Sequence, residues 1–450
     1  MLGAGRRVRE VVVSPGRSAV LLGLLFGLAG TSTSAVTVTL PELAGELGVT
    51  AATAAWIVSA YTVALAVATP THGRLADMVG IRLPLCLGVA TMALGAALGA
   101  LAPSFPVLIV ARILQGAGSA AIPVLATALI SLRWQGRTQG AVLGRVAGVG
   151  ATLSALGPLI GGGLEALGGW RWAVALPVVS ILAIPALWRT APAGGTGEPI
   201  DVRGAVLVAL AASGLVLLIQ SPSAGLATAG VGALLLVVGV PAVAAHVRSR
   251  PLGFLPREII TNATVLRSAF ATAAVPASWF ALLLGVPLAA ASWGWTPLAT
   301  GTLLLPAAAA GFISPAIART LLSRLGPRRC LTLACPTAIV ALLVAALGGA
   351  MAAPVLLAVA VVLVTAAFGI GQPAMISSVG AAVPVGRRGV ALGVATLVFL
   401  TGASVGAALV GGLAGVVGVP AAFLVLVGFP VAGVVALLVG GPDRVVPAPG

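Results

Sequence analysis

Long apolar runs alternate with short polar connections along almost the whole chain. Each run is about as long as a helix that crosses roughly 30 Å of hydrocarbon, where every backbone polar group must be satisfied within the helix. The pattern therefore predicts an all-α polytopic membrane protein with fourteen transmembrane helices. The predicted segments are Ser18–Leu40, Ala54–Thr71, Leu83–Ala102, Phe105–Ile130, Gly140–Leu164, Trp172–Trp188, Gly204–Gln220, Leu226–His246, Ala269–Ala291, Leu298–Ile317, Leu331–Leu347, Val355–Val379, Gly389–Leu413 and Ala421–Val439.

The composition agrees with this pattern. Of the 450 residues, 60% are hydrophobic and only 7% are charged, which is more apolar surface than a soluble domain can bury. The net charge of +15 does not indicate nucleic acid, because the arginines are spread in small groups between apolar segments and form no continuous basic face. We expect them to contact anionic membrane lipids, with no nucleic-acid partner.

The arginines predict the orientation of the helices. All 24 basic residues are arginines, and all but three lie in alternate connections between the apolar segments. Positively charged loops stay in the cytoplasm, so both termini of this multi-pass protein are predicted to be cytoplasmic. The abundance of alanine, glycine and arginine, with no lysine, indicates a GC-rich bacterial genome and hence the bacterial cell membrane. The exceptions are Arg112, Arg145 and Arg171. Arg145 is expected to extend towards the nearby cytoplasmic face, whereas Arg112 should lie deep in the hydrocarbon zone.

A repeat predicts two related bundles. Gly80-Ile81-Arg82 recurs as Gly326-Pro327-Arg328, and transporters built from such repeats bind substrate between them. The predicted parts are a cytoplasmic tail (1–17), an N-terminal six-helix bundle (18–190), two inserted transmembrane helices (204–246), a cytoplasmic linker (247–268), a pseudo-symmetric C-terminal six-helix bundle (269–440) and a cytoplasmic tail (441–450).

The connection between the second and third segments has the composition of a conformational latch. Its candidate residues are Gly73, Arg74, Asp77, Gly80 and Arg82. The glycines permit a tight loop, and Asp77 can pair with an arginine or cap a helix. A charge contact of this kind is weak enough to exchange during a conformational change. A solvated turn without such a role is the alternative.

The fourth segment places Arg112 and Gln115 one turn apart on one helix face. An arginine within the hydrocarbon costs at least about 2.5–3.5 kcal/mol on insertion scales, so Arg112 must face protein or water. We predict a transport pathway formed by Arg112, Gln115 and the first-segment residues Ser32, Thr33 and Thr37. The alternative is a structural arginine satisfied by backbone carbonyls.

The fifth segment contains Gly157, Pro158, Gly161 and Gly162. Glycines four residues apart let helices approach closely, and proline removes a backbone hydrogen bond and bends the helix. The segment is therefore a candidate pivot, with close packing alone as the alternative.

Together these residues resemble the major facilitator superfamily, and specifically its 14-span drug/proton antiporter branch. Segment 73–82 is similar to the superfamily's cytoplasmic signature, Arg112 through Gly118 to its fourth-helix motif, and Gly157 through Gly162 to its fifth-helix antiporter motif. The resemblance implies a role in proton transfer for Arg112, in export direction for the fifth-helix motif, and in gating for segment 73–82.

One departure from that branch changes the expected substrate. Ser32 stands where the branch carries an aspartate, and none of the nine acidic residues falls in the middle of a predicted segment. A proton-coupled exporter holds its proton on a buried carboxylate, so proton antiport is implied here by the resemblance alone. Without a carboxylate partner, Arg112 is expected to pair bidentately with an anionic group of the substrate, near neutral hydrogen bonds from the hydroxyl side chains and Gln115.

The favoured function is secondary active efflux of an amphiphilic small molecule, such as an antibiotic, drug or secondary metabolite, by alternating access. The alternatives are an importer or exchanger of a small organic anion, favoured by the missing carboxylates, and a non-transporting membrane sensor that retains the fold. No paired carboxylates, metal-ligand cluster or nucleotide-binding loop indicates an enzyme, and no cofactor is expected. We expect a monomer.

Overall fold

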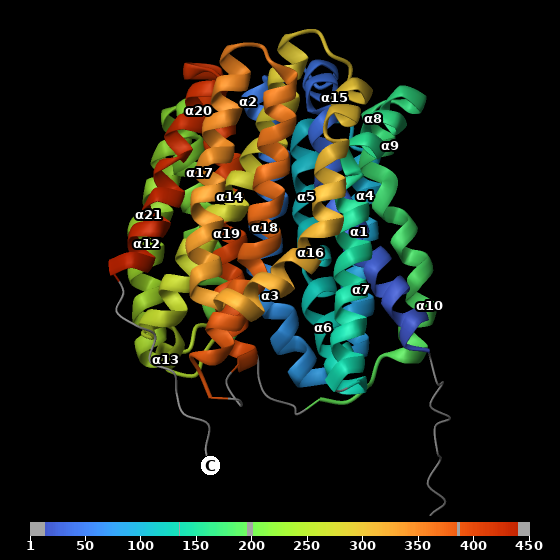
Figure 1. Ribbon diagram of the computed structural model, residues 1–450, viewed down its shortest axis with the longest axis vertical. Helices are drawn as coiled ribbons and strands as arrows, with labels where there is room; N and C mark the ends of the chain where they lie inside the picture. The colour runs from blue at the N-terminus through green and yellow to red at the C-terminus, as the bar shows by residue number, and fades with distance from the viewer. Residues whose placement is uncertain (1–13, 135, 196–200, 385–387, 440–450) are drawn as a thin grey trace, which may run out of the picture.

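The regular structure of the chain is helical. In the computed structural model, the described residues form 21 α-helices and one 3₁₀ helix (Figure 1). The structure describes residues 14–134, 136–195, 201–384 and 388–439. The predicted C-terminal tail and most of the predicted N-terminal tail lie outside the described residues.

The helices up to residue 190 are α1 (Pro15–Glu46), α2 (Ala51–Ala54), α3 (Trp56–Val79), α4 (Arg82–Ala100), α5 (Phe105–Ser119), α6 (Ala121–Arg133), α7 (Gly136–Ala155), α8 (Gly157–Gly168), α9 (Trp170–Ala175), η1 (Leu176–Ala183) and α10 (Ile184–Thr190). The middle of the chain forms α11 (Val202–Ala224), α12 (Leu226–Ser249) and α13 (Arg257–Ile260). The remaining helices are α14 (Ala263–Ser292), α15 (Pro297–Leu303), α16 (Leu305–Leu325), α17 (Pro327–Ala350), α18 (Pro354–Ala381), α19 (Arg388–Val417), α20 (Val419–Leu426) and α21 (Gly428–Val439).

The chain is a multi-pass membrane protein. Within the described residues, 12 helical stretches are long and apolar enough to cross a membrane, or up to 13 if the bent pair Ala141–Ala155 and Gly157–Gly168 forms one span. The predicted number of fourteen is not confirmed. Helix α3 covers the second predicted segment but is not among the twelve, because polar residues and a proline in its second half, Thr69, Pro70, Thr71 and His72, lower its hydropathy.

Two helices extend beyond the apolar runs from which the segments were predicted. Helix α3 continues to Val79, so Gly73, Arg74 and Asp77 lie in a helix and not in a loop. Helix α14 begins at Ala263, before the predicted segment Ala269–Ala291 and inside the predicted linker 247–268. There the side chain of Asn262 accepts hydrogen bonds from the backbone N–H groups of Thr264 (3.0 Å) and Val265 (3.1 Å).

The first part of the chain (α1–α10) and the second part (α14–α21) share their largest apolar core at one end of the molecule. This end holds α2, α15 and α20, at the top of Figure 1, and we call it the α15 end. Its core joins helices that are distant in sequence through Leu40 of α1, Trp170 of α9, Phe280 of α14 and Leu342 of α17. The two parts are therefore packed together most extensively here.

At the opposite end, which holds α13 and the α3–α4 corner and is called the α13 end, each part has its own core. One includes Leu85 and Leu125, and the other Leu331 and Phe399. A small cluster around Phe254 joins α3, α11 and α19 at this end. The division of the core indicates a molecule closed at the α15 end and less tightly joined at the α13 end.

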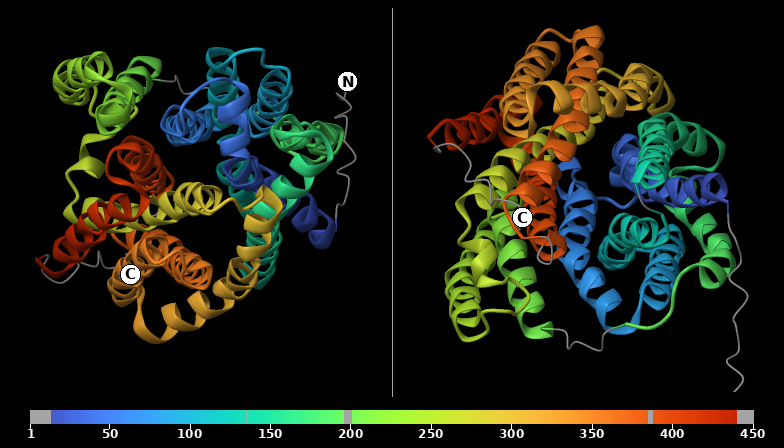
Figure 2. Two further views of the ribbon diagram at one scale, coloured as in Figure 1. Left: turned by 90° about the horizontal axis from the view of Figure 1, so that it is seen from above. Right: turned by 60° about the horizontal axis from the view of Figure 1, so that its bottom comes forward.

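Helices α11 and α12 pack against each other along their length, and α11 also contacts α19 and α3. In the left view of Figure 2 the pair lies at the edge of the molecule. The Gln220 side-chain amide of α11 donates a hydrogen bond to the Ser59 hydroxyl of α3 (2.9 Å). The inserted pair is thus attached to both parts of the chain through α11.

The start of this pair is held by Asp201. Its carboxylate accepts from the backbone N–H of Gly204 (3.0 Å) and of Phe254 (2.9 Å), and from Nε2 of His246 (2.8 Å). Burial alone would raise the pKa of Asp201, but these donors outweigh it and lower the pKa below its ordinary value. One carboxylate therefore caps α11 and fastens the end of α12 and the segment after it.

Asp201→Asn is expected to lower the free energy of unfolding by about 1–3 kcal/mol, because an amide oxygen replaces a charged acceptor. Since folding lowers the pKa of Asp201, its contribution is present above about pH 4 and is lost as the pH falls through the folded value. Thermal unfolding in detergent between pH 7 and pH 3 measures this. An equal acid-induced loss in the wild type and in Asp201→Asn would contradict the assignment.

Candidate functional site

Arg112 is fully buried among three helices. Its Nε donates to the Ile57 carbonyl of α3 (3.2 Å), and its Nη1 donates to the Ser32 carbonyl (3.0 Å) and hydroxyl (3.3 Å) of α1. Nη1 also donates to Oε1 of Gln115, one turn further along α5. The structure thus brings the predicted site residues Arg112, Gln115 and Ser32 together, and α1, α3 and α5 meet at this guanidinium.

Tyr61 completes this cluster, although it was not among the predicted site residues. Its ring lies under the guanidinium of Arg112, 4.4 Å from the centroid, and its hydroxyl donates to the Ala29 carbonyl (2.8 Å). A cation over a buried aromatic face is stabilised by the ring quadrupole. The available signal was that Tyr61 is the sole tyrosine of the chain and lies in an apolar segment.

Three buried polar atoms at this site have no hydrogen-bond partner among the described residues: Nη2 of Arg112, Nε2 of Gln115 and Oγ1 of Thr33. All the hydrogen-bond acceptors that Arg112 contacts are neutral. An unsatisfied buried donor costs about 1–3 kcal/mol, and more when charged. An added hydrogen-bond acceptor would satisfy these donors, and an anionic acceptor would also offset the charge of Arg112.

The detailed geometry differs from the prediction in three respects. Nη1 of Arg112 is already engaged, so the two free donors belong to Arg112 and Gln115, and the bidentate contact expected from Arg112 alone is not available in this conformation. Thr37 donates to the Ser34 carbonyl of its own helix (2.8 Å) and is occupied there. Arg112 also lies only two turns after the start of α5, about 10 Å along the axis, and thus nearer the α15 end than expected.

The fifth predicted segment is broken, as Pro158 suggested. Helices α7 and α8 meet at an angle of 44°. Proline lacks the N–H that would bond the carbonyl four residues earlier, and the Ser34 hydroxyl of α1 donates to that carbonyl of Ser154 (2.8 Å). The Thr31 hydroxyl similarly donates to the Leu153 carbonyl (2.9 Å). Helix α1 therefore supplies the hydrogen bonds that support the break, and neither of its two donors was predicted.

The glycines of α8 permit backbone contacts on two sides. Gly157 and Gly161 face Ser34 and Ala35 of α1. Gly162 faces α15 in the second part of the chain, where an added Cβ would lie 2.6 Å from the Pro297 carbonyl oxygen and 2.7 Å from the Leu298 Cα. Such distances leave no space for a methyl group, so α8 and α15 are in close backbone contact between the two parts at the α15 end.

The predicted latch residues lie at the α3–α4 corner. Gly80 ends α3 with φ 86°, a conformation that favours glycine. Arg82 donates through Nε to the Ala191 carbonyl (2.8 Å) and lies over the Trp188 ring. This corner is thus fastened to the segment that follows α10, within the first part of the chain.

The two other exceptional arginines lie in the middle of α7 (Arg145) and at the start of α9 (Arg171). Arg145 is exposed, with Nη1 beside Gly16 at the start of α1. Arg171 forms an ion pair with Glu46 and stacks on the Trp170 ring, whose Nε1 donates to Glu46 (2.6 Å). Arg171 therefore connects α9 to α1 at the α15 end.

No group of three or more His, Cys, Asp or Glu side chains within the described ranges is placed to hold a metal ion. The chemistry of the cluster is therefore hydrogen bonding and charge, contributed by α1, α3 and α5.

Comparison with known proteins gives one family and several partial relatives. The Major Facilitator Superfamily matches residues 22–400. The efflux pump dotC of Dothistroma septosporum (strain NZE10 / CBS 128990) is 37% identical over 153 residues, covering 34% of this chain and 26% of that protein. An uncharacterised MFS-type transporter of Mycobacterium tuberculosis (strain CDC 1551 / Oshkosh) is 34% identical over 215 residues, covering 45% of this chain and 30% of that protein. An uncharacterised transporter of Escherichia coli (strain K12) is 31% identical over 202 residues, covering 44% of each chain. The chain thus matches less than half the length of each of these relatives.

Proposed function

Because the chain belongs to the Major Facilitator Superfamily, we propose that it is a secondary active exporter of amphiphilic small molecules that works by alternating access. The observation that carries this proposal is the buried cluster of Arg112, Gln115 and Tyr61, which has unsatisfied donors between three membrane helices. The partial similarity to an efflux pump supports export as the direction.

The distribution of packing supports alternating access. The two parts share a core at the α15 end and have separate cores at the α13 end. Nη2 of Arg112 and Nε2 of Gln115 are inaccessible to solvent, so substrate reaches them only after helices move. The close contact of α8 with α15 and the bend before α8 provide a joint at which the α15 end can open.

The free donors favour a substrate with an anionic group. A carboxylate or phenolate oxygen can accept from Arg112 Nη2 while a second acceptor receives Gln115 Nε2, and charge-assisted bonds of this kind are stronger than neutral ones. Thr33 adds a neutral hydroxyl to the same cluster. The apolar part of the substrate would pack on the surrounding helices.

Proton antiport is part of the proposal through family membership. In the described part of the chain the contacts of Arg112 are carbonyls, a hydroxyl, an amide and an aromatic ring, and none is a carboxylate. The proton would therefore bind away from Arg112, or the anionic substrate itself would neutralise the charge of Arg112.

The proposed setting is a bacterial cell membrane, with a monomer of fourteen spans and both termini in the cytoplasm. The proposed division is the one expected from the sequence: bundles at 18–190 and 269–440, an inserted pair at 204–246, and the linker and tails between and beyond them. In this orientation the α13 end is cytoplasmic, as its many arginines favour. Attachment of the α11–α12 pair at the edge of the molecule agrees with an insertion between two bundles.

The absence of an acidic partner for Arg112 within the described residues also favours a second function. The protein could import or exchange a small organic anion, since a permanently charged arginine with a free donor suits such a substrate. The direction of transport separates the two functions.

Transport into inverted vesicles with an imposed pH gradient tests the proposal. We expect the vesicles to accumulate anionic amphiphiles to a higher level than neutral ones, and to lose this accumulation when the pH gradient is collapsed. Vesicles that lack the protein are the control. Uptake into right-side-out vesicles alone would support the importer. Equal fluxes in protein-containing and protein-free vesicles for all compounds would contradict both.

A further inference from the structure

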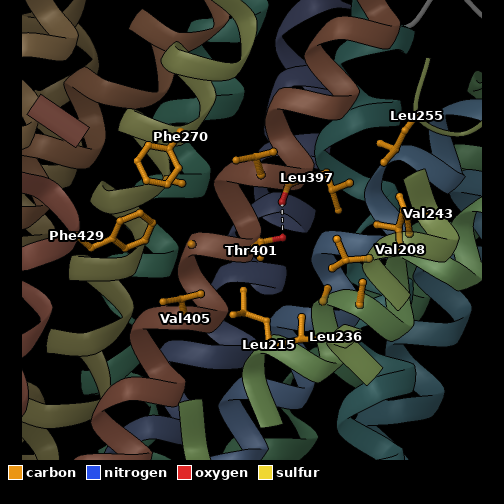
Figure 3. Close-up of a pocket in the computed structure, with 16 residues that line it drawn as sticks. Val208, Leu215, Leu236, Val243, Leu255, Phe270, Leu397, Thr401, Val405 and Phe429 are labelled. Carbon is orange, nitrogen blue, oxygen red and sulfur yellow. Dashed lines mark hydrogen bonds between the residues drawn. The ribbon is translucent and has the colours of Figure 1, made fainter. Parts of the chain in front are cut away.

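An apolar groove separates the α11–α12 pair from the second part of the chain. It has a volume of about 390 Å³ and is lined by α11, α12, α14, α19 and α21. Figure 3 shows Phe270 and Phe429 on one side, Val208 and Val243 on the other, and Leu397 between them. The volume is that of a small-molecule pocket, and the groove lies away from the cluster around Arg112.

The lining offers no free polar group to a ligand. Thr401 is its one hydroxyl-bearing residue, and that hydroxyl donates to the Leu397 carbonyl of its own helix (2.8 Å). A bound water needs two to four polar partners, which this groove does not provide. The groove therefore suits a hydrocarbon chain.

The groove is accessible from the surface of the protein that faces lipid. Phe270 and Val240 line it while exposing 42% and 54% of their surface. Helix α12, which forms one wall, carries further exposed apolar side chains, among them Val237 (72%) and Leu234 (62%). Since the walls that reach the surface are bathed in bilayer, an acyl chain can enter from the side.

The end of the groove nearest α13 is basic. Arg267 is exposed one helical turn before Phe270 on α14, so it lies on the same face of the helix as a groove residue. Helix α12 ends in Arg248, within two turns of the groove residue Val243. The exposed arginines of segment 201–268 are Arg203, Arg248, Arg250, Arg257 and Arg267, against the carboxylates of Asp201 and Glu258 alone.

The Asp201 cluster fixes this arrangement. Because Asp201 accepts from the backbone N–H of Phe254, the segment after α12 is held against the start of α11. Phe254 is buried there, and the next residue, Leu255, lines the groove. The contacts of Asp201 therefore hold the basic end of α12 and the apolar groove in fixed positions relative to each other.

We propose that this groove binds one acyl chain of an anionic phospholipid, whose headgroup phosphate contacts Arg267 at the mouth. A basic site between membrane helices at the end expected to be cytoplasmic matches the way proteins hold anionic lipid headgroups. The lipid fills the gap beside α12 and joins the inserted pair to α14 and α19.

A photoactivatable phosphatidylglycerol with a diazirine in its acyl chain tests the proposal on the full-length protein in nanodiscs. We expect crosslinks to peptides containing residues 208–215 and 397–405. Crosslinking should fall about fivefold in Arg267→Gln, the factor that corresponds to about 1 kcal/mol per arginine, and should be lost in Ala212→Phe, which fills the groove. A phosphatidylcholine probe of the same chain should label these peptides several-fold less.

Two matched variants serve as controls. Arg319→Gln removes an exposed arginine from α16, and Leu343→Phe enlarges an exposed apolar residue of α17, so both should leave crosslinking unchanged. Equal labelling by the two lipids, or undiminished labelling in Ala212→Phe, would overturn the proposal. Displacement of the probe by a transported amphiphile would also overturn it, because the groove would then be a substrate site. Arg267→Gln keeps the test valid if Ala212→Phe fails to fold.

Discussion

Arg112→Gln is expected to reduce transport of an anionic amphiphile by roughly tenfold to a hundredfold, while transport of its neutral isostere falls much less. The variant removes the charged donor Nη2 and the cation over Tyr61. A hydrogen bond to a charged group contributes about 1.5–3 kcal/mol, which corresponds to this range. Initial rates for both compounds in inverted vesicles measure the effect.

Two further variants separate recognition from a structural role of Arg112. Arg112→Lys keeps the charge, but its three donors are all needed for the acceptors of Ile57, Ser32 and Gln115, so it should also transport the anion poorly. Arg319→Gln, on an exposed face of α16, should transport both compounds normally. If Arg112→Gln lowers transport of the anion and of the neutral isostere by the same factor, Arg112 has only a structural role.

Gly162→Ala is expected to weaken closure of the α15 end and to reduce transport by about fivefold to a hundredfold. Its Cβ would lie 2.6 Å from the Pro297 carbonyl oxygen, and a backbone atom cannot move aside without shifting α15. Overpacking of this kind costs about 1–3 kcal/mol, which accounts for the expected range. Hydrogen–deuterium exchange of residues 297–303 should rise together with the loss of transport.

Gly163→Ala is the matched control, since it lies on the same helix and an added Cβ there meets no atom within 4 Å. Both variants gain the same helix propensity, so a difference between them isolates the contact with α15. Equal transport and equal exchange in the two variants would show that the closeness of α8 to α15 has no role in closure.

The hydrophobic pattern was sufficient for the helical membrane fold, because spanning helices are specified by length and hydropathy alone. It was less reliable at helix ends, where polar caps such as Asn262 decide the boundary. It also misplaced Arg74 and Asp77 in a loop, since charged residues do not end a helix and Gly80 does. The number of spans stayed unconfirmed for a related reason, as α3 carries more polar residues than a typical span.

The candidate site could be predicted in part. A charge in an apolar segment identified Arg112, and helical spacing identified Gln115. Tyr61, Thr31 and Ser34 were missed because their importance depends on which helices are neighbours, and periodicity along one helix carries no such information. Whether Nε2 of Gln115 finds a partner likewise depends on the neighbouring helices, and spacing along α5 does not predict it.

The most direct test of the account is binding of three matched amphiphiles to the purified protein: a carboxylate, its methyl ester and a quaternary ammonium compound of the same shape. The account predicts that the carboxylate binds at least about tenfold more tightly than the ester, as one charge-assisted hydrogen bond would give, and that Arg112→Gln abolishes the difference. Tighter binding of the quaternary ammonium compound, unchanged in Arg112→Ala, would contradict it.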